Sequence, residues 1–286
     1  MKNSDITDAL FRQAVEAIDA GNMTLLVNLL RKHPRLIKEP LTRPSGDYFE
    51  NPYLLWFIAD NPIRVKSLPP NIVDITRLLV EFVKREAADS LQKQLDYTLG
   101  LVTTGSTPRE CGVQIQLIDL LIDAGAKPGG GAGALAHGNI AAANHLVERG
   151  GELTLATAVG LERINDIKRL VKTAGGDEKL TALTVAAFYG KTQMISLLLD
   201  AGANPNGYPK NASGFHTHAT PLHQAVYSGS LDAVKLLVGA GAKLDARDKA
   251  YSGTPVGWAE YMRTEEAPDA AAKQRFATIQ DYLLSL

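Results

Sequence analysis

The chain has 286 residues, 45% of them hydrophobic, and 30 basic side chains balance 31 acidic ones. Nucleic-acid-binding proteins cluster Lys and Arg to displace counterions from phosphate, so this balance argues against a nucleic-acid partner. Cys111 is the single cysteine, which excludes an internal disulfide and indicates a reducing compartment.

The N-terminal segment carries acidic residues where a secretory signal would have an apolar stretch. No run of about 18 uninterrupted apolar residues suggests a membrane span. We therefore expect a cytoplasmic protein that does not enter a membrane. We also expect Cys111 to be a half-buried apolar side chain rather than a reactive thiol.

Helical periodicity begins near the N-terminus. Phe11, Val15 and Ile18 form one apolar stripe, and a second stripe follows after Gly21-Asn22, which predicts a first helix pair over 7–33 that Pro34 closes. A second pair starts at the degenerate phrase NPYLLW, and a third runs over 91–127. Between the first two pairs, LTRPSGDYFE predicts a long loop.

Glycines that end second helices serve as a ruler for the spacing of the units. They are Gly125, Gly150, Gly175, Gly202 and Gly241, at steps of 25, 25, 27 and 39 residues. We expect Gly202 and Gly241 to adopt the left-handed backbone that ends a helix. Phe276, Ile279, Leu283 and Leu286 form a last apolar stripe that predicts a capping helix.

The clearest phrase is TPLHQAVYSGSLDAVKLLVGAGAKLD, over 220–245. It resembles the ankyrin repeat family, whose unit begins with T-P-L-H-x-A and carries a V-x-x-L-L-x-x-G-A run in its second helix. The resemblance implies an all-α fold, an α-solenoid of stacked helix-turn-helix repeats. Because the family period is about 33 residues, the short steps imply that some repeats lack the β-hairpin finger.

We predict one array over 1–286, because a two-helix unit buries its apolar face only against a neighbour. Its approximate units are 7–33, 52–87, 91–127, 129–152, 153–178, 179–206, 219–245 and 252–286, with insertions at 34–51 and 207–218. Pro221 and Pro255 suit the first helical turn.

The resemblance also implies a binding face. In the family pattern, the two positions before the glycine that ends the first helix point into the concave surface. The corresponding residues are His137, Leu161, Phe188, Tyr189, Tyr227, Ser228, Tyr261 and Met262. Aromatic side chains concentrate binding energy, although the rings, Phe188 above all, could instead fill gaps between first helices.

The longest step contains NGYPKNASGFHTHAT, which predicts an extended loop with His216 and His218 on one face. A metal site would need a third ligand, such as His223 or Asp248. The resemblance gives His223 a structural role, so we predict no metal site. In the alternative interpretation, His216 and His218 bond to neighbouring loop backbone.

The glycine run after Pro128 lacks the GK[ST] ending of a phosphate-binding loop, and it more simply predicts a tight turn into a small helix. No motif of a catalytic nucleophile or metalloprotease is present, so we predict no catalytic residues and no cofactor.

Three functions remain open. The first is a monomeric, non-enzymatic scaffold that binds a partner protein through its concave face. The second is an enzyme or small-molecule binder with a pocket between that groove and the 41–70 and 207–218 segments, which Tyr48, Phe49, Tyr53 and Trp56 could wall. A structural spacer is the third, and the aromatic stripe argues against it.

Overall fold

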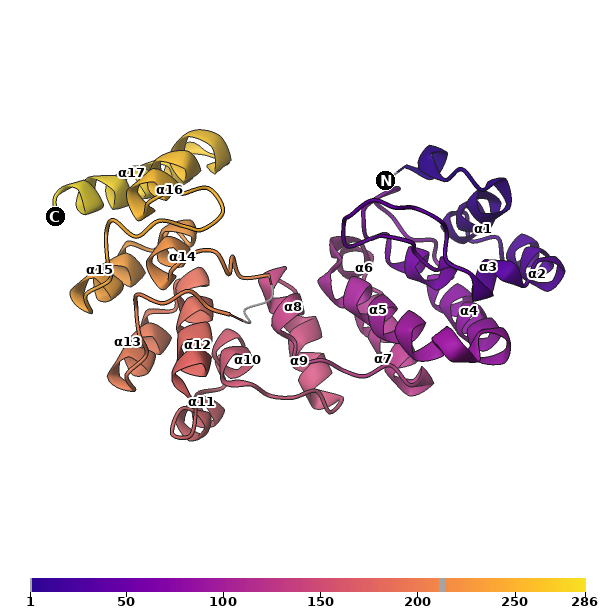
Figure 1. The fold of residues 1–286 in the computed structure, drawn as a ribbon, viewed down its shortest axis with the longest axis horizontal. Helices are drawn as coiled ribbons and strands as arrows, with labels where there is room; N and C mark the ends of the chain where they lie inside the picture. Colours follow the sequence, from indigo (N-terminus) through magenta and orange to yellow (C-terminus); the bar gives the residue numbers. More distant parts are fainter. Residues whose placement is uncertain (1, 211–213) are drawn as a thin grey trace. The chain divides into compact units, whose positions relative to one another are not determined.

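The computed structural model describes residues 2–210 and 214–286, and all regular secondary structure within these ranges is helical. The chain divides into two compact units, Met1–Glu152 and Leu153–Leu286, here called the first and second units. In each, short helices pack side by side, connected by tight turns and by longer loops such as 39–53, 60–71 and 240–254 (Figure 1). The predicted all-α repeat fold is confirmed.

The first unit is built from helices of 3 to 15 residues. They are η1 (Asn3–Asp5), α1 (Ala9–Asp19), α2 (Met23–Lys32), α3 (Arg35–Lys38), η2 (Leu54–Ala59), α4 (Ile72–Glu86), η3 (Ala88–Ser90), α5 (Leu91–Thr104), α6 (Ser106–Glu110), α7 (Gln114–Ala124), α8 (Ala132–Ala136) and α9 (Ile140–Glu148).

The first pair, α1 and α2, shows how local sequence sets these ends. Asp8 begins α1 by accepting hydrogen bonds from the backbone N–H groups of Leu10 and Phe11, both at 3.0 Å. Both terminal guanidinium nitrogens of Arg35 donate to the same carboxylate, and this contact lowers the pKa of Asp8 to about 2. Asn22 caps α2 in the same way.

The aromatic residues of the 41–70 segment form the core of the first unit. Phe49 and Phe57 are fully buried, and their ring centroids lie 5.3 Å apart. Trp56 is also buried, and its ring stacks on Tyr97 with 3.9 Å between centroids. The expectation that Phe49, Tyr53 and Trp56 wall a pocket is therefore wrong, because all three are covered; Tyr48 alone of the four is exposed.

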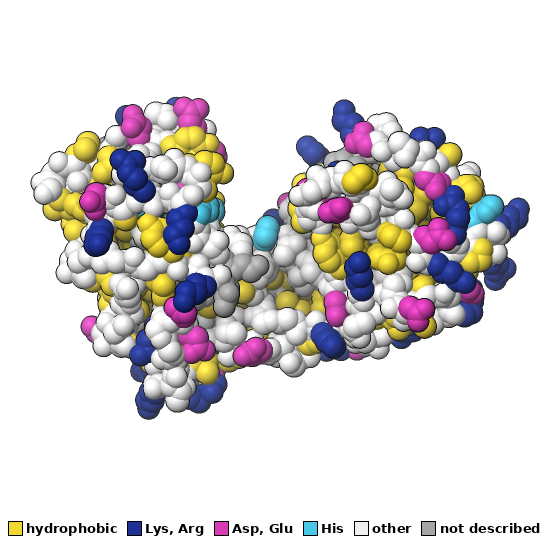
Figure 2. All heavy atoms as spheres, viewed as in Figure 1, with side chains coloured by type: hydrophobic (Ala, Val, Ile, Leu, Met, Phe, Trp, Pro, Cys, Tyr) yellow, Lys and Arg dark blue, Asp and Glu magenta, His cyan; other side chains and the backbone are white. Residues whose placement is uncertain are grey.

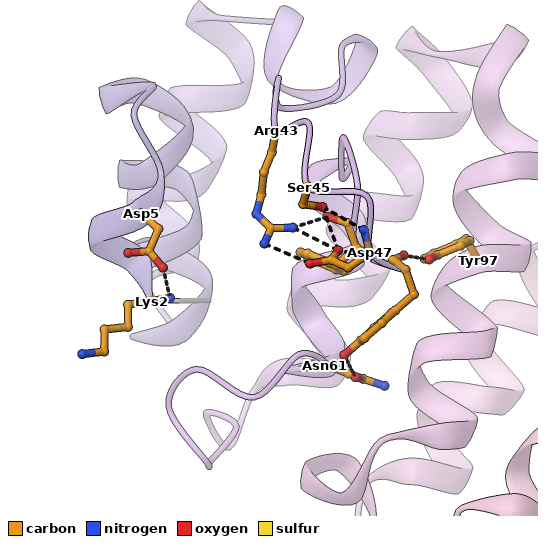
Figure 3. Close-up of polar contacts among 9 residues, drawn as sticks. Lys2, Asp5, Arg43, Ser45, Asp47, Asn61 and Tyr97 are labelled. Carbon is orange, nitrogen blue, oxygen red and sulfur yellow. Dashed lines mark hydrogen bonds and ion pairs between the residues drawn. The ribbon is translucent and has the colours of Figure 1, made fainter. Parts of the chain in front are cut away.

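Polar contacts pin the loop that carries these rings. Arg43 and Ser45 both bond to the carboxylate of Asp47, which holds the pKa of Asp47 down to about 2. The Tyr48 hydroxyl donates to Asn61 at 2.9 Å, and the Tyr97 hydroxyl donates to the carbonyl of Tyr48 (Figure 3). The loop is thus held by bonds within itself, by Asn61 after η2 and by Tyr97 of α5.

Charged side chains are buried in the turn after η2. The Asp60 carboxylate accepts backbone N–H groups of residues 64, 65 and 66, and the hydroxyl of Thr107 at 3.1 Å. Arg64, whose side chain is 1% exposed, donates to Asp19 at 2.7 Å. These bonds offset part of the cost of removing the charges from water; Nε and Nη1 of Arg64 are buried and form no hydrogen bond with the described residues.

The second unit contains four pairs of consecutive helices, with a π-helical turn in the last. The helices are α10 (Leu155–Gly160), α11 (Ile164–Leu170), α12 (Gly176–Phe188), α13 (Thr192–Asp200), α14 (Pro221–Tyr227), α15 (Leu231–Gly239), α16 (Pro255–Tyr261), η4 (Met262–Glu266) and α17 (Ala270–Leu284). The first helices pack in the order α10, α12, α14 and α16, while α13, α15 and α17 form a second row beside them (Figure 1). This is the stacking that the apolar stripes predict.

The predicted helix ends mostly agree with the structure. Gly202 and Gly241 have φ of +84° and +83°, and Pro221 and Pro255 each occupy the first turn of a helix. The prediction that Gly175 ends the second helix of its unit is wrong. Gly175 has φ of −70° and precedes α12 instead of ending α11.

Three further expectations have clear outcomes. Gly131, at φ +76°, begins α8 against the backbone of Ala143, where a Cβ atom would come within 3.1 Å of a carbonyl oxygen, so the glycine run is a tight turn into a small helix. Cys111 is exposed and not half-buried, because it lies at the end of α6 facing solvent. Leu286 lies beyond α17 and is also exposed, so it is not part of the apolar stripe.

Candidate functional site

The start of α14 is held by the TPLH phrase. The side-chain hydroxyl of Thr220 lies 2.8 Å from Nδ1 of His223, and the backbone N–H of Thr220 donates to the same nitrogen. Nε2 of His223 then donates to the carbonyl of Gly253, at 3.1 Å, in the turn before the next repeat. Burial lowers the pKa of His223, which favours this neutral tautomer. The histidine therefore braces two successive repeats, as the resemblance implies.

Asp248 shapes the turn that His223 contacts. Its buried carboxylate accepts four hydrogen bonds, from the backbone N–H groups of Ala250, Tyr251 and Gly253 and from the indole of Trp258. Burial works against ionisation, but these donors outweigh it and lower the pKa of Asp248. Because its oxygens serve the turn, Asp248 fixes Tyr251 and Trp258 in place.

A continuous cluster of aromatic rings extends from α12 to α16 and includes residues of the turns just described. Phe188 at the end of α12 stacks on Tyr227 at the end of α14, with centroids 5.2 Å apart. His216 packs edge-on against Tyr227 at 4.9 Å and against Trp258 at 5.6 Å. His218 continues the cluster to Tyr251, at 5.8 Å.

The rings border a cavity of about 700 Å³ in the second unit. Its aromatic lining consists of His216, His218, Tyr227, Tyr251, Trp258 and Tyr261. Met262, Asp248, Glu266 and two glycines complete the wall. Tyr251 is 83% exposed and Tyr261 is 54% exposed, so the cavity opens to solvent between side chains that protrude from its rim.

His216 is the most constrained member of the cluster. Its backbone has φ of +37°, and its ring nitrogen Nδ1 lies 3.1 Å from the side-chain oxygen of Gln224. The amide of Gln224, itself buried, donates back to the carbonyls of Phe215 and His216. Burial lowers the pKa of His216, with His218 adding to the effect. The His216 ring thus bonds to the side chain of Gln224 in α14 and not to neighbouring loop backbone, so the alternative to metal binding is wrong in this detail.

His218 lies beside His216, with 5.7 Å between ring centroids, and its carbonyl accepts the N–H of Lys249. Within residues 2–210 and 214–286, no group of three potential metal ligands comes together. The pair of histidines accordingly forms part of an aromatic surface.

Four turns show that the predicted binding-face residues occupy equivalent places in their repeats. His137, Leu161, Tyr189 and Ser228 each precede a residue with a left-handed backbone, namely Gly138, Glu162, Gly190 and Gly229, at φ of +71°, +55°, +62° and +70°. The residues before these left-handed positions each form the C-terminal cap of the first helix of their repeat. This structural equivalence supports the alignment of these residues with the family pattern, including the repeat in which Glu162 takes the place of the glycine.

The side chains at those positions differ in what they offer a partner. Tyr189 is half-buried; its ring lies 5.2 Å from that of Phe188, and the Lys191 ammonium lies 5.5 Å from the ring centroid of Tyr189. The Ser228 hydroxyl donates to the carbonyl of Ala225 and accepts from the N–H of Ser230, so it stabilises the turn. Leu161 is half-buried.

His137 lies in the first unit, exposed at the end of α8. Its Nδ1 lies 2.9 Å from the carbonyl of Gly133. The first unit has a separate, shallower hollow of about 530 Å³ along α4 and α7, lined by Arg77, Asp119 and Asp123 among others, and His137 is not part of it.

Tyr261 and Met262 depart from this pattern. After α16 the chain continues into the π-helical turn η4 in place of the left-handed turn. The Tyr261 hydroxyl donates to Glu266 at 3.0 Å, and this bond raises the pKa of Tyr261. Both residues consequently line the cavity, and η4 adds Glu266 to it.

Three aromatic members of the site are absent from the predicted set: Phe215, Tyr251 and Trp258. Phe215 is fully buried and packs against Phe188 at 5.1 Å. Trp258 stands four residues after Thr254, where the TPLH phrase would suggest only helix interior. The sequence did contain a signal for Tyr251 and Trp258: both are aromatic, and they lie on either side of the TPVG segment at 254–257, which corresponds to the TPLH start of a repeat.

Figure 2 shows hydrophobic side chains in patches among small, mixed groups of acidic and basic ones. In the described part of the chain, none of the helices combines the length and apolar character that a membrane crossing requires.

Comparison with known proteins identifies the repeats. A family profile described as ankyrin repeats, in 3 copies, matches residues 133–248. The chain is 32% identical over 105 residues to cyclin-dependent kinase inhibitor 2A of Monodelphis domestica, which covers 27% of this chain and 61% of that protein. It is 38% identical over 65 residues to an ankyrin repeat-containing protein of Schizosaccharomyces pombe, which covers 23% of this chain and 28% of that protein.

A third relative is cyclin-dependent kinase 4 inhibitor B of Bos taurus. The identity is 30% over 115 residues, 39% of this chain and 83% of the bovine protein. The chain thus spans under two thirds of the first two relatives and most of the third. With the TPLH contacts and the stacked helix pairs, this match shows that the chain belongs to the ankyrin repeat family.

Proposed function

We propose that the chain is a non-enzymatic scaffold that binds a partner protein through the ring-lined face of its second unit. The observation that carries the proposal is the cluster of Phe188, Tyr189 and Tyr227 beside a cavity rimmed by Tyr251 and Tyr261. Tyrosine and tryptophan provide large contact areas with few rotatable bonds, and they concentrate binding energy at interfaces.

Preorganisation favours this interpretation. Tyr227 is held by Phe188 and His216, and the turn with Tyr251 is held by Asp248 and His223. Side chains that are already ordered lose little entropy when a partner binds. The names of two relatives describe inhibitors of cyclin-dependent kinases, which are proteins. From those names we carry over only that the partner is a protein.

The test is affinity capture from native lysate followed by mass spectrometry. We expect Tyr189→Ala with Tyr227→Ala to abolish capture of a partner that the wild type retains. Tyr48→Ala serves as the matched control, because Tyr48 is an exposed tyrosine of the first unit. Thermal unfolding of each variant accompanies the capture. An unfolded double variant would show that the two rings are core, and undiminished capture would exclude them from the binding face.

A small-molecule binder is the second candidate, because the cavity volume of about 700 Å³ falls in the usual range of ligand pockets, about 300–1,000 Å³. Three titratable groups of its wall have shifted pKa values, His216, Asp248 and Tyr261, but each is already engaged in hydrogen bonds within the protein. Retention of a metabolite by the purified wild type, with no protein captured, would favour this candidate.

A further inference from the structure

The cavity wall combines aromatic rings with acidic side chains. Tyr227, Tyr251, Trp258 and Tyr261 contribute aromatic rings, Met262 a polarisable sulfur, and Glu266 a carboxylate, while the described lining residues include no Lys or Arg. Aromatic faces carry partial negative charge and attract cations. The wall therefore complements a positively charged group that also has apolar surface.

Three lysines of the second unit have their ammonium groups on tyrosine rings that do not line the cavity. Lys249 follows Asp248 directly, yet its ammonium lies over the ring of Tyr208, 4.2 Å from the centroid. Lys191 and Lys235 lie over Tyr189 and Tyr282 in the same manner, at 5.5 Å and 5.7 Å. The repeats thus already hold ammonium groups on tyrosine rings outside the cavity.

The state of the two carboxylates distinguishes between possible cations. Asp248 is surrounded by its four donors, and Glu266 shares one oxygen with the Tyr261 hydroxyl. A guanidinium is best recognised by two free oxygens of one carboxylate, which this wall does not offer. An ammonium needs a single acceptor beside the rings, and Glu266 provides it.

We infer that the cavity receives a lysine side chain presented by the partner protein, with its alkyl stem against Met262 and the rings, and its ammonium toward Glu266. This inference rests on the proposed function and specifies the partner's contact. The volume, about 700 Å³, accommodates the side chain together with adjacent backbone.

The test uses the full chain and the indole signals of its two tryptophans in ¹H–¹⁵N NMR. Trp258 lines the cavity, whereas Trp56 is buried in the first unit and reports non-specific effects. The probes are the peptides acetyl-Ala-Ala-Xaa-Ala-Ala-amide, with lysine, arginine or norleucine as Xaa, and tetramethylammonium. We expect the lysine peptide to shift the Trp258 signal saturably and leave Trp56 unmoved, and the norleucine peptide to bind about fivefold more weakly or worse.

Glu266→Gln isolates the charge, because the amide oxygen can still accept from Tyr261. The lysine peptide should bind this variant at least about threefold more weakly, with no change for norleucine. Glu260→Gln removes the same charge from an exposed residue of α16 outside the cavity wall, and should have no effect. An unchanged Trp258 signal before peptide addition verifies the fold of each variant.

Each other outcome overturns the inference. The lysine site is excluded if the lysine peptide shifts no signal or if the norleucine peptide binds as tightly as the lysine peptide. It is also excluded if the arginine peptide binds more tightly, or if only tetramethylammonium produces a response. The wider proposal fails differently, through the absence of any captured partner. A captured partner that binds Glu266→Gln as tightly as wild type leaves the scaffold intact and removes only the lysine contact.

Discussion

The ring of Tyr227 lies nearly parallel to that of Phe188, at an interplanar angle of 22° and a centroid distance of 5.2 Å. The two residues end the first helices of successive repeats, so their stacking connects one repeat to the next at the surface. Tyr227 remains 37% exposed, which allows the same ring to serve stability and recognition.

This stacking predicts measurable coupling between repeats. In a double-mutant cycle with Phe188→Leu and Tyr227→Leu, we expect a coupling free energy of about 0.5–1.5 kcal/mol. Leucine keeps apolar volume and removes the aromatic pairing. Urea unfolding of the four proteins measures it, and additive free energies of unfolding would show that the rings merely lie close together.

Asp248→Asn should loosen the turn before α16. The amide keeps one acceptor oxygen and points its NH₂ group at the two donors that the other carboxylate oxygen accepts, so we expect the free energy of unfolding to fall by about 2–3 kcal/mol. The comparison is Asp245→Asn, which alters an exposed carboxylate nearby and should change stability little. Chemical denaturation gives both values; equal effects of the two substitutions would contradict the role of Asp248.

Acidification should destabilise the second unit before carboxylates titrate. The pKa values of His216 and His223 are lowered from 6.5, chiefly by burial, so the unfolded chain takes up protons first as the pH falls. The stability they contribute is fully present above pH 6.5 and is lost as the pH drops toward their folded-state values.

The measurement is urea unfolding between pH 8 and pH 5, followed by Trp258 fluorescence in a Trp56→Phe background. His216→Asn is the informative variant, because asparagine tolerates the left-handed backbone at this position. We expect it to reduce the loss of stability on acidification. A pH dependence identical to that of the parent protein would rule out His216 as a contributor.

Arg64→Met tests the buried charges of the first unit. Removing the guanidinium leaves the Asp19 carboxylate without its cationic partner at 2.7 Å, with only the neutral amide of Asn3 still donating to it at 2.8 Å, and we expect a loss of about 3–5 kcal/mol. Adding Asp19→Leu should restore much of that loss, since the unpaired charge is then gone. Guanidinium chloride unfolding provides the values. A loss under about 1 kcal/mol for Arg64→Met would mean that water reaches Asp19 freely.

Several local features of the fold were predictable because contiguous residues encode them. A proline in the first turn, a glycine at a left-handed helix end and apolar residues three or four apart depend on neighbours along the chain. Gly202, Gly241, Pro221 and Pro255 accordingly lie where their patterns predict. The first helix pair also lies within its predicted range. The extent of a single array over 1–286 stays a prediction.

The exposure of each ring was not predictable, because it depends on residues distant in sequence. Phe49 and Trp56 became core through contacts with Phe57 and Tyr97, although their loop composition resembled an accessible insertion. Cys111 is exposed because its helix ends at the surface.

The sequence by itself determined the repeat, its helix ends and the positions from which a binding face could be formed. Only the tertiary structure decided that His216, Tyr227 and Trp258 meet around one cavity and that η4 brings Glu266 to it. The physical reason is that helix formation follows local backbone preferences, whereas a cavity is the space left between side chains of different repeats after they pack.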